Sequence, residues 1–112
     1  MRNLSLLLLV TLSNVTAASD APDLARGKTL YMANCMACHG AMGGGDGPAA
    51  RALKPPPRSF LVADYWKDMT DDRLKAAIKA GRPGTAMMAF GQLNESDMAD
   101  VVAFVKSLRP QP

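Results

Sequence analysis

The residues of this chain that are best suited to chemistry are two cysteines and a histidine within one short run, residues 35–39 (CMACH), and they are the only cysteines and histidine in the sequence. Two thiols three residues apart near a helix end lie on one side of the backbone, where each can add to one vinyl group of a haem. The histidine that follows then falls beneath the iron as its fifth ligand. The run therefore predicts one haem c per chain, attached at Cys35 and Cys38 and ligated by His39.

Three other interpretations of this run fit the sequence less well. A structural zinc site needs four protein ligands, whereas the chain has two cysteines and one histidine. A thioredoxin-like dithiol occurs in a βαβ setting, and no strand alternation is present around the run. A plain disulfide explains neither His39 nor the methionines that follow far along the chain.

The iron needs a sixth ligand, and the chain has eight methionines. Six are excluded by their position in the signal, close to the attachment run, beside a helix cap or in a core stripe: Met1, Met32, Met36, Met42, Met69 and Met98. Met87 and Met88 remain, in a loop rich in glycine and proline roughly fifty residues after His39. Loop, distance and residue type all suit an iron ligand, and the spacing alone leaves open which of the two binds.

Helices must position these residues, and the sequence predicts an all-α class. One helix is expected from about residue 24 to 35, after a Pro-Asp start. A second lies between Thr70, its N-cap, and Gly81, its C′ residue. A last helix is capped by Asn94 and carries an apolar stripe at helical spacing as far as Leu108.

Two glycine- and proline-rich stretches, residues 40–57 and 84–91, are predicted as loops, with a short helix near residues 49–53. Within the first, residues 43–47 (GGGDG) bear some likeness to a phosphate-binding loop. They lack the Gly-Lys-Ser/Thr ending and the preceding strand of such loops. We therefore expect this run to be backbone packed beside the haem.

Residues 1–18 predict a cleaved export signal, with Arg2, an apolar run over residues 4–12 and small side chains at residues 16–18. The rival interpretation is an uncleaved anchor, but the run is shorter than the ~20 apolar residues that span a bilayer. Cleavage leaves one domain, residues 19–112, and a periplasmic location. No later segment is apolar enough to cross a membrane.

The charge of the chain argues against a nucleic-acid partner. Removing the signal takes away Arg2 alone, so that 13 basic against 10 acidic residues becomes 12 against 10. Basic residues are scattered among aspartates, as on an ordinary solvated surface, and two haem propionates would bring the balance close to zero. We expect electron-transfer rates to depend only mildly on ionic strength, because steering scales with opposed charge.

The chain resembles the bacterial class I cytochromes c. The resemblance covers nearly all of the mature sequence and rests on Gly27, Tyr31 and residues 35–39, 43–48, 81–90 and 93–108. It implies a small cytochrome c fold, in which three to four helices wrap around one covalently bound haem. It also implies that the first and last helices cross at a contact between Gly27, Tyr31 and Phe104.

The same resemblance assigns roles near the iron. Members of the family often have a proline about nine residues after the haem histidine, whose carbonyl accepts the hydrogen bond of the imidazole; Pro48 has that spacing. Such a bond fixes the tautomer of the ligand. By alignment Met87 is the sixth ligand, and Met88 stands where relatives usually have proline, as an alternative ligand. Four side chains are candidate partners of the haem propionates: Arg51, Arg58, Arg82 and Trp66.

A haem with histidine and methionine on its two faces has no open position for a substrate, and methionine favours a higher reduction potential than a second histidine. The predicted function is one-electron transfer, without enzyme activity, between periplasmic or membrane-bound reductases and oxidases. The protein would be a monomer or one subunit of a complex. Two alternatives remain: a haem subunit of a periplasmic oxidoreductase, and a gas-binding or peroxidatic haem with a labile methionine.

Overall fold

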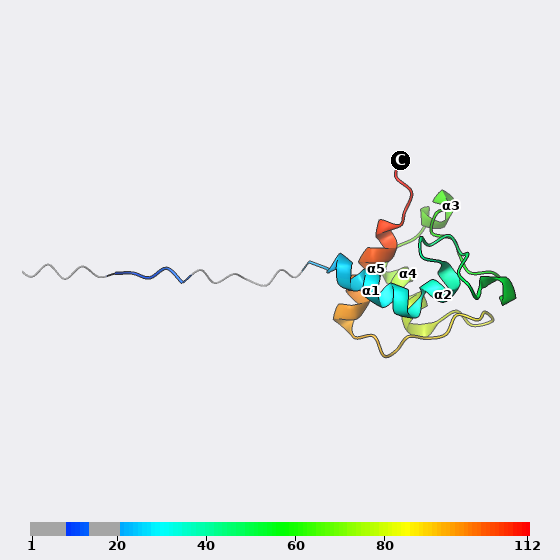
Figure 1. Ribbon diagram of the computed structural model, residues 1–112, viewed down its shortest axis with the longest axis horizontal. Coiled ribbons are helices and arrows are strands. Elements are labelled where there is room, and N and C mark those ends of the chain that lie inside the picture. The colour runs from blue at the N-terminus through cyan, green and yellow to red at the C-terminus, as the bar shows by residue number, and fades with distance from the viewer. Residues whose placement is uncertain (1–8, 14–20) are drawn as a thin grey trace, which may run out of the picture.

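The structure of the protein is a computed structural model that describes residues 9–13 and 21–112. These residues form five α-helices, one 3-10 helix and no strand, which confirms the all-α class (Figure 1). The helices are α1 (Leu24–Asn34), α2 (Met36–His39), η1 (Ala50–Ala52), α3 (Ala63–Trp66), α4 (Asp71–Ala80) and α5 (Glu95–Ser107). The number exceeds the predicted three to four because α2 and α3 are single turns of four residues each.

The predicted signal, residues 1–18, lies mostly outside the described residues. Its described part, residues 9–13, has no regular secondary structure and is exposed. No helix among residues 9–13 and 21–112 has the length and apolar character needed to span a bilayer.

Each of the three long helices begins at an N-cap residue whose side chain accepts a backbone hydrogen bond from the first turn. The carboxylate of Asp23 accepts from the Arg26 backbone N–H at 3.0 Å at the start of α1. The Thr70 hydroxyl caps α4. At α5, Asn94 and Asp97 form a reciprocal capping box, with bonds of 2.8 and 3.2 Å. Each bond satisfies a backbone N–H that has no partner within the helix.

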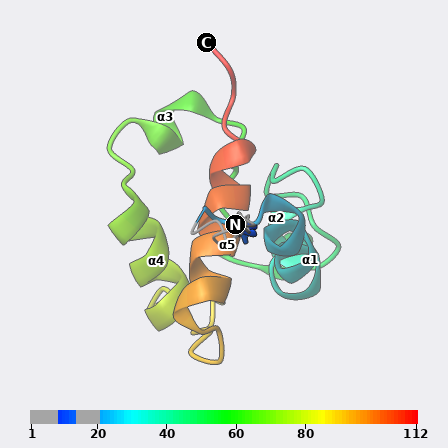
Figure 2. The same ribbon diagram turned by 90° about the vertical axis from the view of Figure 1, so that its left-hand side faces the viewer.

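Helix α5 lies at the centre, with α4 on one side and α1 on the other (Figure 2). The crossing of α1 and α5 is close because Gly27 has no side chain. A Cβ at this position would lie 2.1 Å from the Asp100 carbonyl oxygen and 3.1 Å from the Cβ of Phe104. Beside it the fully buried Tyr31 ring packs on Phe104, with centroids 5.1 Å apart. The predicted contact of the first and last helices is confirmed.

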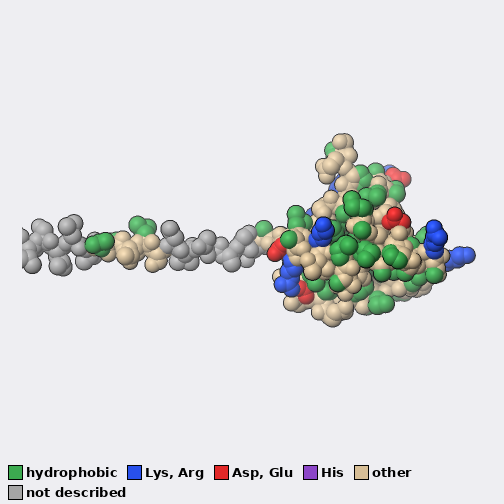
Figure 3. Space-filling view, in the orientation of Figure 1, with side chains coloured by type: hydrophobic (Ala, Val, Ile, Leu, Met, Phe, Trp, Pro, Cys, Tyr) green, Lys and Arg blue, Asp and Glu red, His purple; other side chains and the backbone are tan. Residues whose placement is uncertain are grey.

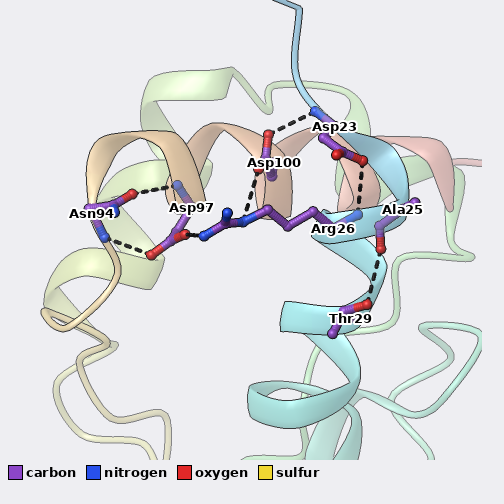
Figure 4. A network of polar contacts seen from close by, with 7 residues as sticks. All are labelled: Asp23, Ala25, Arg26, Thr29, Asn94, Asp97 and Asp100. Atoms are coloured by element: carbon purple, nitrogen blue, oxygen red, sulfur yellow. Dashed lines mark hydrogen bonds and ion pairs between the residues drawn. The ribbon is translucent and has the colours of Figure 1, made fainter.

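A polar network joins the N-terminal end of α1 to α5 beside this crossing (Figure 4). Asp100 is buried, at 5% exposure, and its carboxylate accepts from the Asp23 backbone N–H at 2.8 Å. Arg26 forms an ion pair with Asp97, and its Nε lies 3.6 Å from Asp100. A buried carboxylate is stable only when it is paired and hydrogen-bonded, so these contacts hold the two helices in register.

Candidate haem-binding site

The two cysteines lie where α1 passes into α2. Cys35 ends α1 and precedes α2, whereas Cys38 lies within α2 and its backbone N–H donates to the Cys35 carbonyl. Both thiols are free and half-buried. Burial, and to a lesser extent the neighbouring Cys38, raises the pKa of Cys35 to about 11. Cys35 therefore stays a protonated thiol at neutral pH.

His39 ends α2 with its ring held on one face and at one nitrogen. The ring stacks on Phe60, with centroids 4.8 Å apart and an interplanar angle of 17°. Its Nδ1 lies 3.0 Å from the Arg58 carbonyl oxygen. A carbonyl can only accept, so Nδ1 carries the hydrogen and Nε2 keeps its lone pair. Burial lowers the pKa of His39, with the bond to Arg58 acting in the opposite direction, and so favours the neutral imidazole that binds metals.

The acceptor of this bond differs from the sequence prediction, because the Arg58 carbonyl stands where Pro48 was expected. The reason is the path of the loop after α2. The backbone N–H of Gly45 donates to the His39 carbonyl at 2.8 Å, and that of Ala49 donates to the Ala37 carbonyl at 2.8 Å. Residues 45–49 thus run back along the outside of α2 and leave Pro48 exposed, and the later part of the loop brings Arg58 to the imidazole.

Tyr31 fixes the end of this short helix from the core. Its buried hydroxyl donates to the Gly40 carbonyl at 2.6 Å, directly after His39. The ring of Tyr31 packs on Phe104 of α5. One side chain therefore connects the α1–α5 crossing to the segment that carries the cysteines and the histidine.

The two methionines of the loop between α4 and α5 differ in how deeply their side chains are buried. Met87 is half-buried and packs against the core, whereas Met88 is 68% exposed. Both backbone groups of Met87 are held: its N–H donates to the Thr85 hydroxyl at 3.2 Å, and its carbonyl accepts from the Arg82 N–H at 3.1 Å. Gly81 has a φ of 69° and lets the backbone of Met87 pack closely against it. A Cβ at Gly81 would come within 2.6 Å of the Met87 carbonyl oxygen.

Phe60 and Tyr65, which the sequence patterns did not single out, form an aromatic cluster with Trp66 beside the histidine. Phe60 contacts both His39 and Tyr65, and Tyr65 meets Trp66 edge-on at 5.2 Å. The indole N–H of Trp66 donates to the Phe60 carbonyl at 2.8 Å and is buried, so it is not available to a propionate. The only signal for this cluster in the sequence was its composition, since residues 60–66 hold three aromatics without a regular period.

The residues present suit a covalently held haem. Two free thiols lie about one helical turn apart, a neutral imidazole retains one free nitrogen, and a half-buried thioether lies on a separate, anchored loop. Imidazole and thioether are the axial donors of cytochromes c. In the part of the chain that the structure describes, no three or more His, Cys, Asp or Glu side chains come together in a way that could hold a different metal ion.

Comparison with known proteins agrees with this fold and site. Residues 24–109 match the family model for cytochrome c. The chain is 34% identical over 95 residues to cytochrome c6 of Thermosynechococcus vestitus, covering 84% of this chain and 78% of that protein. A chain of the Kuenenia stuttgartiensis reducing HAO-like protein complex Kustc0457/Kustc0458 superposes with a TM-score of 0.70 at 34% identity, over 75% of this chain and 41% of that one. The KustC0563 c-type cytochrome gives 0.61 at 25% identity, over 75% and 98%.

Fold and site together define a small all-α haem protein of the electron-transfer class. The chain belongs to the cytochrome c family, and within it to the class I monohaem cytochromes. It carries haem c, with iron, in covalent attachment.

Proposed function

We propose that the protein is a periplasmic one-electron carrier whose haem is held by thioether bonds to Cys35 and Cys38, with His39 and Met87 as its axial ligands. The observation that carries this proposal is the contrast between Met87, turned inward on an anchored loop, and Met88, exposed to solvent. A chain that supplies both axial ligands leaves the iron no position for a substrate. The haem held in this way would supply one-electron chemistry through the ferric and ferrous states of its iron.

Attachment uses the thiols as the structure presents them. Cys35 and Cys38 would hold the haem by two thioether bonds, each S–H adding across one vinyl group so that one vinyl carbon takes the sulfur and the other takes the hydrogen. Cys35 and Cys38 are free and half-buried, which supports their role as the attachment points.

His39 binds through Nε2 because Nδ1–H is committed to the Arg58 carbonyl. A hydrogen bond of this kind fixes the tautomer and ring orientation and raises the basicity of the ligand. The Phe60 ring, stacked on the imidazole, limits its rotation further. A ligand fixed in this way moves little between the two oxidation states, which suits rapid electron transfer.

Location in the periplasm rests on the export signal predicted in residues 1–18. The donor and acceptor would be redox proteins of that compartment or its membrane. The relative from Thermosynechococcus vestitus is itself named a cytochrome c6, and the match covers most of both chains, which supports a carrier rather than an enzyme.

A second candidate is a permanent haem subunit of an oxidoreductase. It is favoured by one observation, the similarity to a chain of the Kuenenia stuttgartiensis complex, of which this chain spans 41%. The mass of the native protein in size-exclusion chromatography separates the two, since a free carrier elutes at the mass of one chain with its haem.

The experiment that tests the carrier proposal compares two neighbouring substitutions. Met87→Ala should remove the sixth ligand, lower the reduction potential and let carbon monoxide bind the ferrous haem. Met88→Ala should leave all three unchanged, because its side chain is exposed. The double variant, with both methionines replaced by alanine, excludes that Met88 binds the iron in place of Met87. Rapid carbon monoxide binding by the wild type, or a Met–iron charge-transfer band that persists in the double variant, would contradict the ligation.

A further inference from the structure

The aromatic cluster of Phe60, Tyr65 and Trp66 joins the imidazole of His39 to the protein surface. The Phe60 ring stacks on the imidazole, with centroids 4.8 Å apart and an interplanar angle of 17°. The Tyr65 ring follows at 5.3 Å from Phe60, in an edge contact. Phe60 is buried, at 6% exposure, whereas Tyr65 is half-buried. Both spacings lie within the ~4.5–7 Å of packed aromatic pairs, so two ring contacts lead from the proposed iron ligand to a side chain at the surface.

A hydrogen bond gives a second connection between the same two ends. The Nδ1–H of His39 donates to the Arg58 carbonyl at 3.0 Å. The guanidinium of the same arginine lies 5.3 Å from the centre of the Tyr65 ring. Arg58 therefore leads from the imidazole to Tyr65 along its own covalent bonds. The stack through Phe60 and the hydrogen bond to Arg58 are parallel connections that end at one ring.

Trp66 fixes the other two rings of the cluster relative to each other. Its ring is buried, at 6% exposure, and meets Tyr65 edge-on at 5.2 Å. Its indole N–H donates to the Phe60 carbonyl at 2.8 Å. Arg109, which follows α5, places its guanidinium 5.8 Å from the centre of the indole ring. These contacts hold Phe60 and Tyr65 in one arrangement.

Two guanidinium groups make the rings of the cluster difficult to oxidise. Arg58 lies over Tyr65, and Arg109 lies over Trp66. A cation is attracted to the negative face of an aromatic ring, and this attraction turns to repulsion when the ring loses an electron. The cations therefore disfavour a radical on either ring. An electron that crosses the cluster tunnels through it and does not rest on a ring.

We propose that Phe60 and Tyr65 form an electron route on the histidine side of the haem, through which electrons leave or reach the iron. The proposal rests on the carrier function above, which makes His39 an iron ligand. Tunnelling is faster through packed atoms and hydrogen bonds than across gaps, because the electronic coupling decays less steeply through them. A partner that docks at the half-buried Tyr65 would then exchange an electron without touching the haem itself.

The test is photochemical and uses the fact that His39 is the only histidine of the chain. An added surface histidine therefore binds a bis(bipyridine)imidazoleruthenium(II) group at one chosen position of the holoprotein. A light flash excites this group, and hexaammineruthenium(III) in solution takes one electron from it. The resulting Ru(III) label then takes one electron from the ferrous haem, which becomes ferric. The measured quantity is the rate constant of this last step.

Two label positions compare the route with the rest of the protein. Asp64→His places the label beside Tyr65 in α3, and Lys28→His places it on α1; both residues are exposed. Helices α1 and α3 lie on different sides of α5 (Figure 2). Basic and acidic side chains lie side by side near the start of α1 (Figure 3), so the control label lies on an ordinary solvated surface. From residue 28 the backbone of α1 leads to the proposed thioether at Cys35 without passing Phe60.

Phe60→Leu should slow electron transfer from the haem to the label at residue 64 and leave transfer to the label at residue 28 nearly unchanged. The readout is the ratio of the two rate constants, because a change in the reduction potential of the haem acts on both labels alike. Phe104→Leu is the matched control, since its ring packs on Tyr31 at the α1–α5 crossing, and it should leave the ratio unchanged. Tyr65→Leu, at a half-buried position that tolerates substitution better, should lower the ratio as Phe60→Leu does.

One readout does not depend on electron transfer. In the ferrous wild-type protein, nuclear Overhauser effects should connect the ring protons of Phe60 to the imidazole protons of His39. Their absence would overturn the route, because the stack on which it depends would not exist in the holoprotein.

The phenol of Tyr65 separates tunnelling through the ring from oxidation of the ring. Tyr65→Phe keeps the ring and should leave the ratio unchanged, and no tyrosyl radical should appear in electron paramagnetic resonance after the flash. A lower ratio in this variant, or a tyrosyl signal in the wild type, would overturn the tunnelling route.

The remaining outcomes separate the route from the carrier function. Equal effects of Phe60→Leu and Phe104→Leu on the ratio would overturn the route alone, since the loss of any core ring would then suffice. A ferrous haem that neither label oxidises in the wild type would refute the carrier function, and the route with it.

Discussion

Replacing Gly27 by alanine should destabilise the protein, because the new methyl group would enter the closest contact between α1 and α5. Its carbon would lie 2.1 Å from the Asp100 carbonyl oxygen, whereas ordinary contact begins near 3.4 Å, so the two backbones must separate locally by about 1.3 Å. Neither neighbour is the end of a flexible side chain, since the contacts are the Asp100 backbone, with its carbonyl carbon at 2.7 Å, and the Cβ of Phe104 at 3.1 Å.

The magnitude follows from two opposed effects. Overpacking of a well-packed contact costs roughly 1–3 kcal/mol, and a clash with backbone belongs at the upper end. Alanine offsets about 1 kcal/mol of this through its better helix propensity. A net loss of about 2 kcal/mol corresponds to a fall in Tm of about 8–16 °C for a domain of this size.

The assay is thermal unfolding of the holoprotein, followed by far-UV circular dichroism at fixed haem content. Gly91→Ala is the control, because nothing lies within 4 Å of its Cβ position and its φ is not positive. That variant should stay within about 0.5 kcal/mol of the wild type. If Gly27→Ala and Gly91→Ala have the same Tm, the close crossing of α1 and α5 is refuted.

Three further outcomes are expected. In the wild type the haem should resist acid–acetone extraction, and Cys35→Ser or Cys38→Ser should leave one thioether at most; freely extracted haem from a host with cytochrome c maturation would contradict covalent attachment. Tyr31→Phe should lower the free energy of unfolding by about 1–3 kcal/mol in guanidinium titration, since the Gly40 carbonyl loses a buried donor; a loss well under that range would show that water replaces it. Mature protein from the periplasm should begin near Ser19 by N-terminal sequencing, and a membrane-bound product that begins at residue 1 would instead indicate an anchor.

Local features of the fold were predictable because adjacent residues produce them. Thr70 and Asn94 cap their helices through bonds to residues three positions on, and this spacing is visible in the sequence. The crossing at Gly27 was also expected, from the family resemblance together with the cost of a glycine inside a helix.

The acceptor for His39 was not predictable. Any backbone carbonyl can accept a hydrogen bond, so the residue types in the sequence do not indicate which carbonyl is the acceptor. Arg58 lies nineteen positions from His39, and it reaches the imidazole because residues 45–49 hydrogen-bond back to α2. The spacing rule that favoured Pro48 assumes a different course of this loop.

By itself the sequence determined the all-α class, the helix starts and the run of residues 35–39 in which thiols and imidazole stand together. These features depend on contacts within one or two helical turns, which the order of residues specifies directly. Only the tertiary structure decided that Met87 turns inward and Met88 outward, and that the Arg58 carbonyl lies against the imidazole of His39. Such arrangements depend on how loops close over a core, and loop closure is set by many weak contacts between residues far apart in the chain.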